Sequence, residues 1–427
     1  MTERAPVAAR LAAALATVLG AEESPWRLRA WDGSEAGPAG APTLSVRSPR
    51  AVRRLLWAPG ELGLVRAYVS GDLDLEDDVF ATLGALSSGD RLTSSATFPR
   101  PGARDLVGLA RTAVALGAVG RPPAPPTEEF ARPRRGRRHS RSRDARAVAH
   151  HYDVGNDFYA LVLGPTLVYS CAVWTDEGTG LDAAQEAKLD LVCRKLGLRP
   201  GLRLLDVGCG WGSLALHAAG RYGVDVVGIT LSAQQADLAR RRVATAGLEE
   251  RITIRVQDYR EVPDGPFDAI SSIGMAEHVG RVALPGYATA LHRLLRPGGR
   301  LLNHAISWAA GDTTWKDDTF IARYVFPDGE LLPLAVTMAA LHEAGFEVLD
   351  VEALRRHYAL TLRAWVERLD KHWDAAAAMT SEGRARVWRL YMAASALSFE
   401  AGKLGIEQVL VQRPGGNPPP LRLRDWS

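Results

Sequence analysis

Three glycines and one aspartate in the segment RLLDVGCGWGSLAL, residues 203–216, are the first candidates for chemistry in this 427-residue chain. Gly208, Gly210 and Gly212 lie between a strand-like run and a helical one, where the backbone can approach a ligand at the positive end of a helix. A dinucleotide site prefers G-x-G-x-x-G, and here the third glycine comes one residue early. Asp206 repels phosphate but suits a cationic ligand such as S-adenosylmethionine. A packing turn in an unrelated α/β domain is the alternative.

Polar side chains also end the strands that follow this turn. The segment GITLSAQQ ends the next expected strand, and the neutral groups of Thr230 and Gln235 can hold ribose hydroxyls. The segment VQDY ends the third strand, where Asp258 can accept a hydrogen bond from an adenine amino group and Tyr259 can stack on its ring. Glu277 follows the fourth strand. All of these positions meet at the carboxyl edge of the predicted sheet, where α/β proteins bind ligands.

Composition is that of a soluble globular protein with two or three domains: 47% of residues are hydrophobic, 24% are charged and the net charge is +3. The three cysteines, Cys171, Cys193 and Cys209, form no CxxC pair. We therefore expect no metal site and no disulfide framework, and a reducing cytoplasm fits. The first residues predict an amphipathic helix rather than a signal peptide, because Arg10 interrupts their apolar run. The sequence contains no apolar stretch long enough to span a membrane.

Strand-like and helical runs alternate from Leu202 onward, which predicts an α/β fold with a doubly wound parallel sheet. We assign residues 147–427 to this catalytic domain and residues 1–125 to a smaller N-terminal α+β domain with an accessory, lipid-associated role. Residues 126–146 are rich in proline and arginine and predict a linker.

Five ordered segments carry a resemblance to a known family: HYDVGNDFYALVLGPTLVYSCAVW at 151–174, LLDVGCGWGSLALHAA at 204–219, GITLSAQQ at 228–235, IGMAEHVG at 273–280 and FIARYVFPDGELLP at 320–333. Together they resemble the cyclopropane-fatty-acyl-phospholipid synthases and the related mycolic acid cyclopropane synthases over about residues 147–412. The resemblance implies a Rossmann-like class I methyltransferase fold and S-adenosylmethionine-dependent attack on a cis double bond of a phospholipid acyl chain. The N-terminal part resembles the accessory domain of the phospholipid-acting members more loosely, which favours a phospholipid substrate.

The resemblance also implies site residues at the matching motif positions. The implied cofactor-binding residues are Tyr169, Ser170, Asp206, Gly208, Gly210, Gly212, Thr230, Leu231, Gln235, Asp258 and Tyr259. Members of the family also hold a bicarbonate ion as the base. Its implied ligands are Cys171, Glu277, His304, Ile306 and Tyr358.

The reaction places demands on such a site. An isolated alkene is a poor nucleophile, and its methylation creates a cation that a dry, aromatic-rich site tolerates best. The candidate walls are Trp174, Tyr287, Phe320, Tyr324 and Phe326. The new methyl group must then lose a proton before a ring closes, which requires a base within about 3 Å. We expect Glu277 to orient the bound ion rather than to take this proton. We expect a structural role for His278, because neighbouring side chains of an extended segment point to opposite sides.

Three other functions stay open at this point. If the cation loses a different proton, the product is a methylene-branched chain, and a separate reductase then becomes a partner. A small-molecule O- or N-methyltransferase is less consistent with the YSCA and MAEHVG segments. A non-enzymatic lipid-binding protein is less consistent with intact Asp206, Gly208, Gly210 and Glu277.

The expected partner is a phospholipid acyl chain at the inner leaflet of a membrane. The run from Arg132 to Arg146 carries eight arginines, and each cation near an anionic leaflet contributes about 1 kcal/mol. A solvated linker is the plainer interpretation of this run. Nucleic acid is not expected, because nothing resembling a nucleic-acid-binding fold accompanies the arginines. The sequence leaves a homo-oligomer open.

Overall fold

The computed structural model describes residues 5–87, 102–130, 154–309, 319–327, 329–419 and 421. The arginine run from Arg132 to Arg146 lies outside the described residues. The described chain forms two compact units. The first contains residues up to 130 together with 319–325 and 373–398, and the second contains the rest. The predicted domains were continuous stretches of the chain, with boundaries at residues 125 and 146. In the structure, the first unit also contains helices from the C-terminal third of the chain.

The second unit is built on a sheet with the strand order β11-β12-β9-β8-β5-β6-β7. Its strands are β5 (Arg203–Val207), β6 (Asp225–Thr230), β7 (Ile252–Val256), β8 (Phe267–Ile273), β9 (Leu295–Trp308), β11 (Glu347–Ala353) and β12 (Leu404–Gln412). The five strands from β9 to β7 are parallel, whereas β12 runs antiparallel to both β9 and β11. The short strand β10 (Leu332–Pro333) pairs with β9. The predicted Rossmann-like methyltransferase sheet is confirmed, with an antiparallel extension at one edge.

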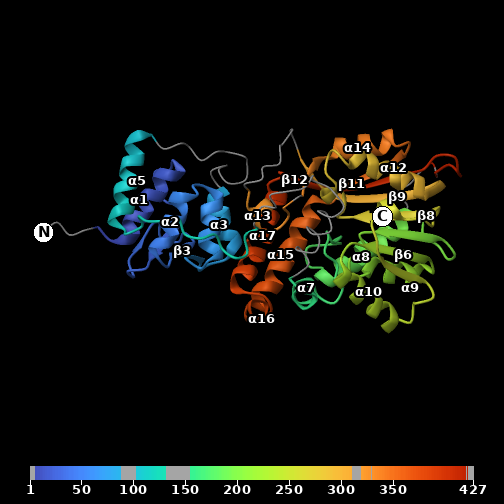
Figure 1. Ribbon diagram of the computed structural model, residues 1–427, viewed down its shortest axis with the longest axis horizontal. Helices are drawn as coiled ribbons and strands as arrows, with labels where there is room; N and C mark the ends of the chain where they lie inside the picture. Colours follow the sequence, from blue (N-terminus) through green and yellow to red (C-terminus); the bar gives the residue numbers. More distant parts are fainter. Residues whose placement is uncertain are drawn as a thin grey trace. The chain divides into compact units, whose positions relative to one another are not determined.

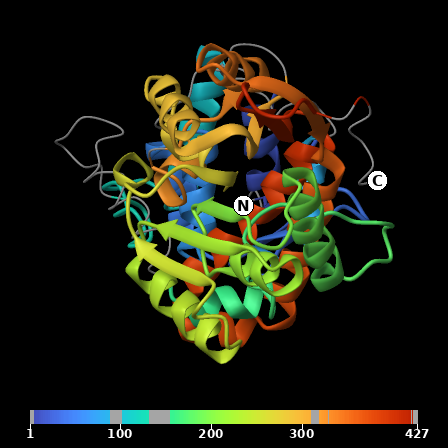
Figure 2. The same cartoon turned by 90° about the vertical axis from the view of Figure 1, so that its right-hand side faces the viewer.

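Two layers of helices cover this sheet (Figures 1 and 2). One layer contains α12 (Leu284–Leu294) and α14 (Leu334–Glu343), and the other contains α8 (Leu181–Leu196), α9 (Ser213–Tyr222) and α10 (Ala233–Thr245). Successive strand residues point to opposite faces, so Leu204 packs with the α8 layer and Leu205 with the α12 layer. Burial on both faces explains why these strands read as nearly continuous apolar runs. The unit also contains α7 (Asn156–Leu163), η1 (Tyr259–Glu261), α11 (Ala276–Val279) and α15 (Arg355–Lys371).

The first unit is a small α+β structure with the sheet order β2-β1-β3-β4. Its strands are β1 (Arg27–Ala30), β2 (Glu35–Ala36), β3 (Thr43–Val46) and β4 (Leu73–Leu75). Its described helices are α1 (Val7–Leu19), α2 (Pro49–Trp57), α3 (Glu61–Val69), α4 (Val79–Ser87), α5 (Ala103–Ala115), α13 (Phe320–Tyr324), α16 (Trp373–Met379) and most of α17 (Glu382–Glu400). Trp26 anchors the core and donates its indole N–H to the Thr82 carbonyl at 2.8 Å. Among the described residues, no helix is long and apolar enough to cross a membrane.

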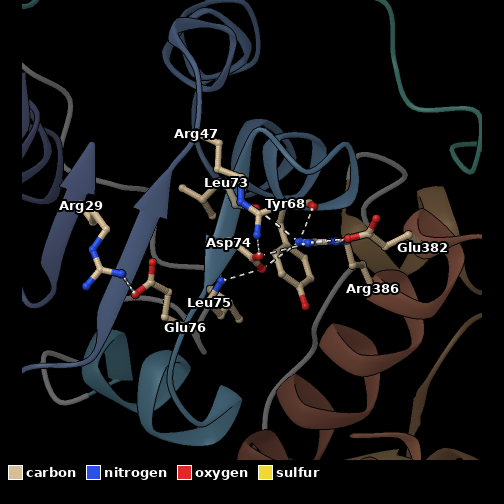
Figure 3. Close-up of polar contacts among 9 residues, drawn as sticks. All are labelled: Arg29, Arg47, Tyr68, Leu73, Asp74, Leu75, Glu76, Glu382 and Arg386. Carbon is tan, nitrogen blue, oxygen red and sulfur yellow. Dashed lines mark hydrogen bonds and ion pairs between the residues drawn. The ribbon is translucent and has the colours of Figure 1, made fainter. Parts of the chain in front are cut away.

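A buried ion-pair cluster joins α17 to β4 within this unit (Figure 3). The side chain of Arg386 is only 4% exposed and donates to Asp74 Oδ1 and to Glu382 Oε1, both at 2.9 Å. Its guanidinium carbon lies 5.0 Å from the centre of the Tyr68 ring. A buried cation is tolerated only when it is paired in this way. The cluster therefore holds a C-terminal helix against the N-terminal sheet.

Replacing Arg386 with methionine should lower the free energy of unfolding by roughly 2 kcal/mol, because the Asp74 carboxylate loses its buried partner and keeps only the exposed Arg47. Arg29→Met is the matched control, since Arg29 pairs with Glu35 and Glu76 at a largely exposed position of the same sheet. The control should change stability much less. Urea denaturation of both variants measures the difference, and equal losses would contradict the role assigned to Arg386.

Candidate functional site

A cavity in the second unit lies at the carboxyl ends of strands β5, β6, β7 and β8. Of the residues predicted to bind the cofactor, those that line it are Tyr169, Ser170, Asp206, Gly208, Gly210, Thr230, Leu231, Gln235, Asp258 and Tyr259. Much of the remaining lining is apolar, including Leu167, Trp211, Ile229, Met275 and Phe326. Segments that are far apart in the sequence thus meet at the edge where the sequence analysis placed them.

The three glycines of the turn after β5 have different roles. All have positive φ, at 81°, 53° and 79° for Gly208, Gly210 and Gly212. A Cβ at Gly208 would lie 2.6 Å from Met275 Sδ, and one at Gly212 would lie 3.2 Å from the Cβ of Ala239 in α10. A Cβ at Gly210 would meet nothing within 4 Å. Gly212 lies outside the cavity lining and allows α9 to pack on α10, whereas Gly210 opens the wall of the cavity.

The residues after β6 form a neutral hydrogen-bonding group. Thr230 Oγ1 donates to Gln235 Oε1 at 2.9 Å, and Ser232 caps helix α10 by accepting the Gln235 N–H at 3.3 Å. The cap fixes the first turn of α10 beside the cavity. Hydroxyl and amide groups held in this way suit the hydroxyls of a ribose.

The residues after β7 form a closed ion pair. Asp258 Oδ1 accepts from the Arg260 Nε at 2.8 Å, and Oδ2 accepts from the same guanidinium at 2.5 Å. That guanidinium also lies 5.3 Å from the centre of the Tyr259 ring. The Tyr259 ring packs edge-on against Tyr287 at 5.4 Å. The adenine contact expected of Asp258 stays a prediction, and the carboxylate already has a cationic partner.

Two further charged groups face the same cavity and are both buried. Asp206 accepts a hydrogen bond from Ser271 Oγ at 2.7 Å, and burial raises its pKa to about 6. Lys188 donates to Ser170 Oγ at 3.1 Å, and burial lowers its pKa to about 8. Lys188 was not predicted from the sequence. The available signal was its place, with Gln185, on the buried face of α8 among Leu181, Ala184, Leu189 and Val192.

Glu277 lies in α11, directly after β8, and one of its oxygens lacks a partner. Oε1 accepts the Ile306 N–H at 2.7 Å. Oε2 is buried with no hydrogen-bond partner among the described residues. Burial raises the pKa of this carboxyl to about 7, and the Ile306 N–H opposes the rise.

His304 precedes Ile306 by two residues on β9, so both side chains lie on the same face of the strand. Its Nδ1 is 3.3 Å from the amide nitrogen of Gln408, and its buried Nε2 has no partner among the described residues. Burial, with help from Lys188 and Lys195, lowers the pKa of His304 to about 3. The ring is therefore neutral. Because the Gln408 amide donates to Nδ1, the single ring proton of His304 lies on Nε2, and Nε2 is therefore a hydrogen-bond donor.

Cys171 and Tyr358 reach the same end of the sheet through Leu354. The Leu354 carbonyl accepts from Cys171 Sγ at 3.7 Å and from the Tyr358 N–H at 3.1 Å. The Leu354 N–H donates to the carbonyl of Ile406, which lies opposite Ile306 across β12 and β9. Burial raises the pKa of the Cys171 thiol, which stays protonated. These contacts bring the segments that carry the five predicted bicarbonate ligands together near the ends of β8 and β9, and none of the five lines the cavity.

The expectation for His278 was wrong in its geometry. His278 lines the cavity, and its ring packs edge-on against Phe326 at 5.6 Å. The expectation assumed an extended segment, whereas residues 276–279 form α11. Neighbouring side chains of a helix do not point to opposite sides.

Of the five expected aromatic walls, only Phe326 lines the cavity. Tyr287 is a core residue whose hydroxyl donates to Ser272 Oγ at 2.6 Å. Trp174 donates its indole N–H to Thr361 Oγ1 at 3.1 Å. Phe320 and Tyr324 belong to the first unit.

The sheet, the glycine turn and the cavity at its carboxyl edge define a class I methyltransferase that uses S-adenosylmethionine. The chain belongs to the mycolic acid cyclopropane synthetase family, whose sequence model matches residues 139–409. The family resemblance, the fold class and the enzyme class predicted from the sequence are therefore confirmed. The alternatives of a small-molecule methyltransferase and of a non-enzymatic lipid-binding protein are not supported.

Individual relatives agree with this assignment. The chain is 44% identical over 416 residues, 95% of each chain, to a probable fatty acid methyltransferase of Mycobacterium tuberculosis. It is 35% identical over 429 residues to tuberculostearic acid methyltransferase UfaA1 of the same organism, covering 96% of this chain and 94% of that one. The structure of mycolic acid cyclopropane synthase CmaA1 complexed with SAH and CTAB matches with a TM-score of 0.60 and 34% identity, over 63% of this chain and 98% of that one. The protein is an S-adenosylmethionine-dependent fatty acid methyltransferase of this family.

The raised pKa of Glu277 predicts a pH-dependent stability difference in the ligand-free protein. A folded-state pKa of about 7, above the usual 4.5, gives a contribution to stability that is complete below pH 4.5 and is lost as the pH rises through about 7. Relative to Glu277→Gln, the unmodified protein should therefore lose about 3 kcal/mol across this range. Urea denaturation of both proteins at several pH values tests this, and a difference that does not vary with pH would show that the carboxyl is solvated.

Proposed function

We propose that the protein transfers a methyl group from S-adenosylmethionine to the cis double bond of a phospholipid acyl chain, and that the product closes to a cyclopropane ring. The observation that carries this proposal is the pair of buried, unpartnered polar atoms at the ends of β8 and β9, Glu277 Oε2 and His304 Nε2. His278, the residue after Glu277, lines the cofactor cavity. The carbonyl of His304 accepts from the N–H of Gly274, which also lines that cavity.

The donor set fits a small oxyanion that carries one proton. An ionised Glu277 accepts a hydrogen bond through Oε2, and a neutral His304 donates one through Nε2. Bicarbonate is such an ion, and it supplies an oxygen base when bound. Cys171, Ile306 and Tyr358 are the remaining members of the proposed ligand set, as the family resemblance implies. The Ile306 N–H, which is bonded to Glu277 in this structure, would have to be shared with the ion.

The roles of the chain's own groups follow from their environment. The Ile306 N–H occupies one oxygen of Glu277 and thereby fixes the direction of the other. Because Glu277 holds an ion instead of meeting the substrate, its carboxylate is protected from alkylation by the acyl cation. In the proposed reaction, apolar residues of the cavity such as Leu167, Ile229 and Phe326 would limit the access of water to that cation. S-Adenosylmethionine, when bound, supplies an electrophilic methyl group.

A second product is favoured by the relatives that match the whole chain. The two full-length relatives described above are methyltransferases by name, and one is a tuberculostearic acid methyltransferase. A methylene-branched chain arises from the same cation by loss of a different proton, and a separate reductase would then convert it to a methyl branch. In both cases the substrate is an acyl chain at a membrane surface, and the inner leaflet is the proposed location.

Product analysis distinguishes these outcomes. We expect expression in a bacterium that has monounsaturated phospholipids and no such enzyme to add one CH₂ to the acyl chains. Mass spectrometry with fragmentation then separates a cyclopropane from a terminal methylene. A cyclopropane supports the first product and a methylene supports the second. Unchanged acyl chains in cells whose purified enzyme binds S-adenosylmethionine would overturn both.

Glu277→Gln should reduce turnover by roughly 10²- to 10⁴-fold while the affinity for S-adenosylhomocysteine changes little, because a neutral amide accepts the ion's O–H more weakly than a carboxylate and holds the base less firmly. Glu407→Gln is the matched control: Glu407 is also a buried glutamate with a raised pKa, but it lies opposite Ala305 on the other face of β9. The control should retain turnover. Calorimetry and acyl-chain assays measure the two effects. A loss of cofactor affinity in Glu277→Gln would mean that the carboxylate belongs to the cofactor site and not to the proposed ion site.

A further inference from the structure

Helix α8 holds the segment that leads from the cofactor cavity to the proposed base site. Gln185 Nε2 donates to the Ser170 carbonyl at 2.9 Å and to the Val168 carbonyl at 3.4 Å. One helical turn further on, the ammonium of Lys188 donates to Ser170 Oγ at 3.1 Å. An ammonium has three N–H donors, and this is the hydrogen bond that the described residues provide for it. Lys188 is 2% exposed and lines the cavity.

The cavity wall carries two cations and two anions, Lys188, Arg260, Asp206 and Asp258, but only one pair of them forms a salt bridge. Lys188 and Asp206 act on each other electrostatically without a hydrogen bond between them among the described residues. Asp258 and Arg260 pair directly with each other. Lys188, on α8, and Asp206, at the end of β5, remain as one buried cation and one buried anion. Asp206 accepts from the Ser271 hydroxyl, which carries no charge. A buried charge is costly unless it is paired, so both groups are poised for ligand groups of opposite charge.

We propose that Lys188, acting with Ser170, binds the carboxylate of the amino-acid portion of S-adenosylmethionine. That portion carries one carboxylate and one ammonium, and Lys188 on α8 and Asp206 on β5 match these two charges within one cavity. A hydrogen bond between two charged groups in a buried site is among the stronger contacts that a protein makes. This inference rests on the use of S-adenosylmethionine and not on which acyl product is formed.

The protonation of Lys188 is consistent with this role. Burial lowers its pKa to about 8, so the ammonium is still charged at neutral pH. The alternative is a role in the base site, because Lys188 also acts electrostatically on Cys171 and His304. The hydrogen bond to Ser170, a cavity residue, favours the cofactor side.

A pair of ligands that differ only in the carboxylate tests the proposal directly. Isothermal titration calorimetry compares S-adenosylmethionine with decarboxylated S-adenosylmethionine. The unmodified protein should prefer the carboxylate-bearing ligand by roughly 10- to 100-fold. In Lys188→Met this preference should fall to a few-fold, because affinity for S-adenosylmethionine drops while affinity for the decarboxylated form is retained.

Two further variants separate charge from packing. Lys188→Gln keeps an N–H donor for Ser170 without the charge and should lose the preference as Lys188→Met does. Lys195→Met removes another fully buried lysine two turns along α8, one that pairs with Glu352 rather than facing the cavity. It should keep the full preference, even if its Tm falls as much as that of Lys188→Met. If Lys188→Met does not fold, the ligand preference is measured on Lys188→Gln alone.

Two results would overturn the proposal. The first is an unchanged preference in both Lys188 variants, and a higher bicarbonate requirement for turnover in those variants would then assign Lys188 to the base site. The second is an equal loss of affinity for both ligands, which would indicate a general packing role. Because none of the binding measurements depends on an acyl substrate, failure of the proposed lipid reaction would leave this test intact.

Discussion

The hydrogen bond from the Ile306 N–H to Glu277 Oε1, at 2.7 Å, is the constraint on which the arrangement of the site depends. Glu277 belongs to a single helical turn after β8, and Ile306 belongs to the neighbouring parallel strand. The Gly274 N–H donates to the His304 carbonyl at 2.8 Å, so the chain that leaves β8 stays against β9 before the helix begins. One carboxylate oxygen is thereby occupied and the other remains available. Without this bond, a carboxylate on so short a helix would be free to turn toward solvent.

Burial shifts the site's ionisable groups toward their neutral forms. The pKa values of Glu277 and Asp206 rise to about 7 and about 6, and those of His304 and Lys188 fall to about 3 and about 8. Such shifts cluster where a protein prepares a place for charged ligands. Only His304 is moved far enough to stay neutral throughout the physiological range, which suits a residue whose task is to donate a hydrogen bond. The pKa values of the other three groups lie close enough to 7 that a bound ligand can determine their charge.

The sequence was sufficient for the parts of the site that have a local pattern. The glycine spacing after β5 and the polar residues after β6 and β7 identified the cavity, because parallel strands bring their carboxyl ends to one edge. Lys188 had no such pattern, since a lysine in a helical stripe is usually assigned to solvent. The geometry of His278 depended on a helix of only four residues. The contribution of α17 to the first unit was not predictable, because the contact between Arg386 and Asp74 spans 312 residues.

The same segments serve both halves of the site, and this links donor binding to the base site. Ser170 lines the cofactor cavity, and the next residue, Cys171, contacts Leu354 at the start of α15. In the proposed reaction, the groups that hold the donor would therefore also position the ligands of the ion. These groups would not select the product, because both proposed products arise from one cation. That choice depends on which C–H bond of the acyl chain lies within reach of the base, and hence on the walls that hold the acyl chain rather than on the glycine turn.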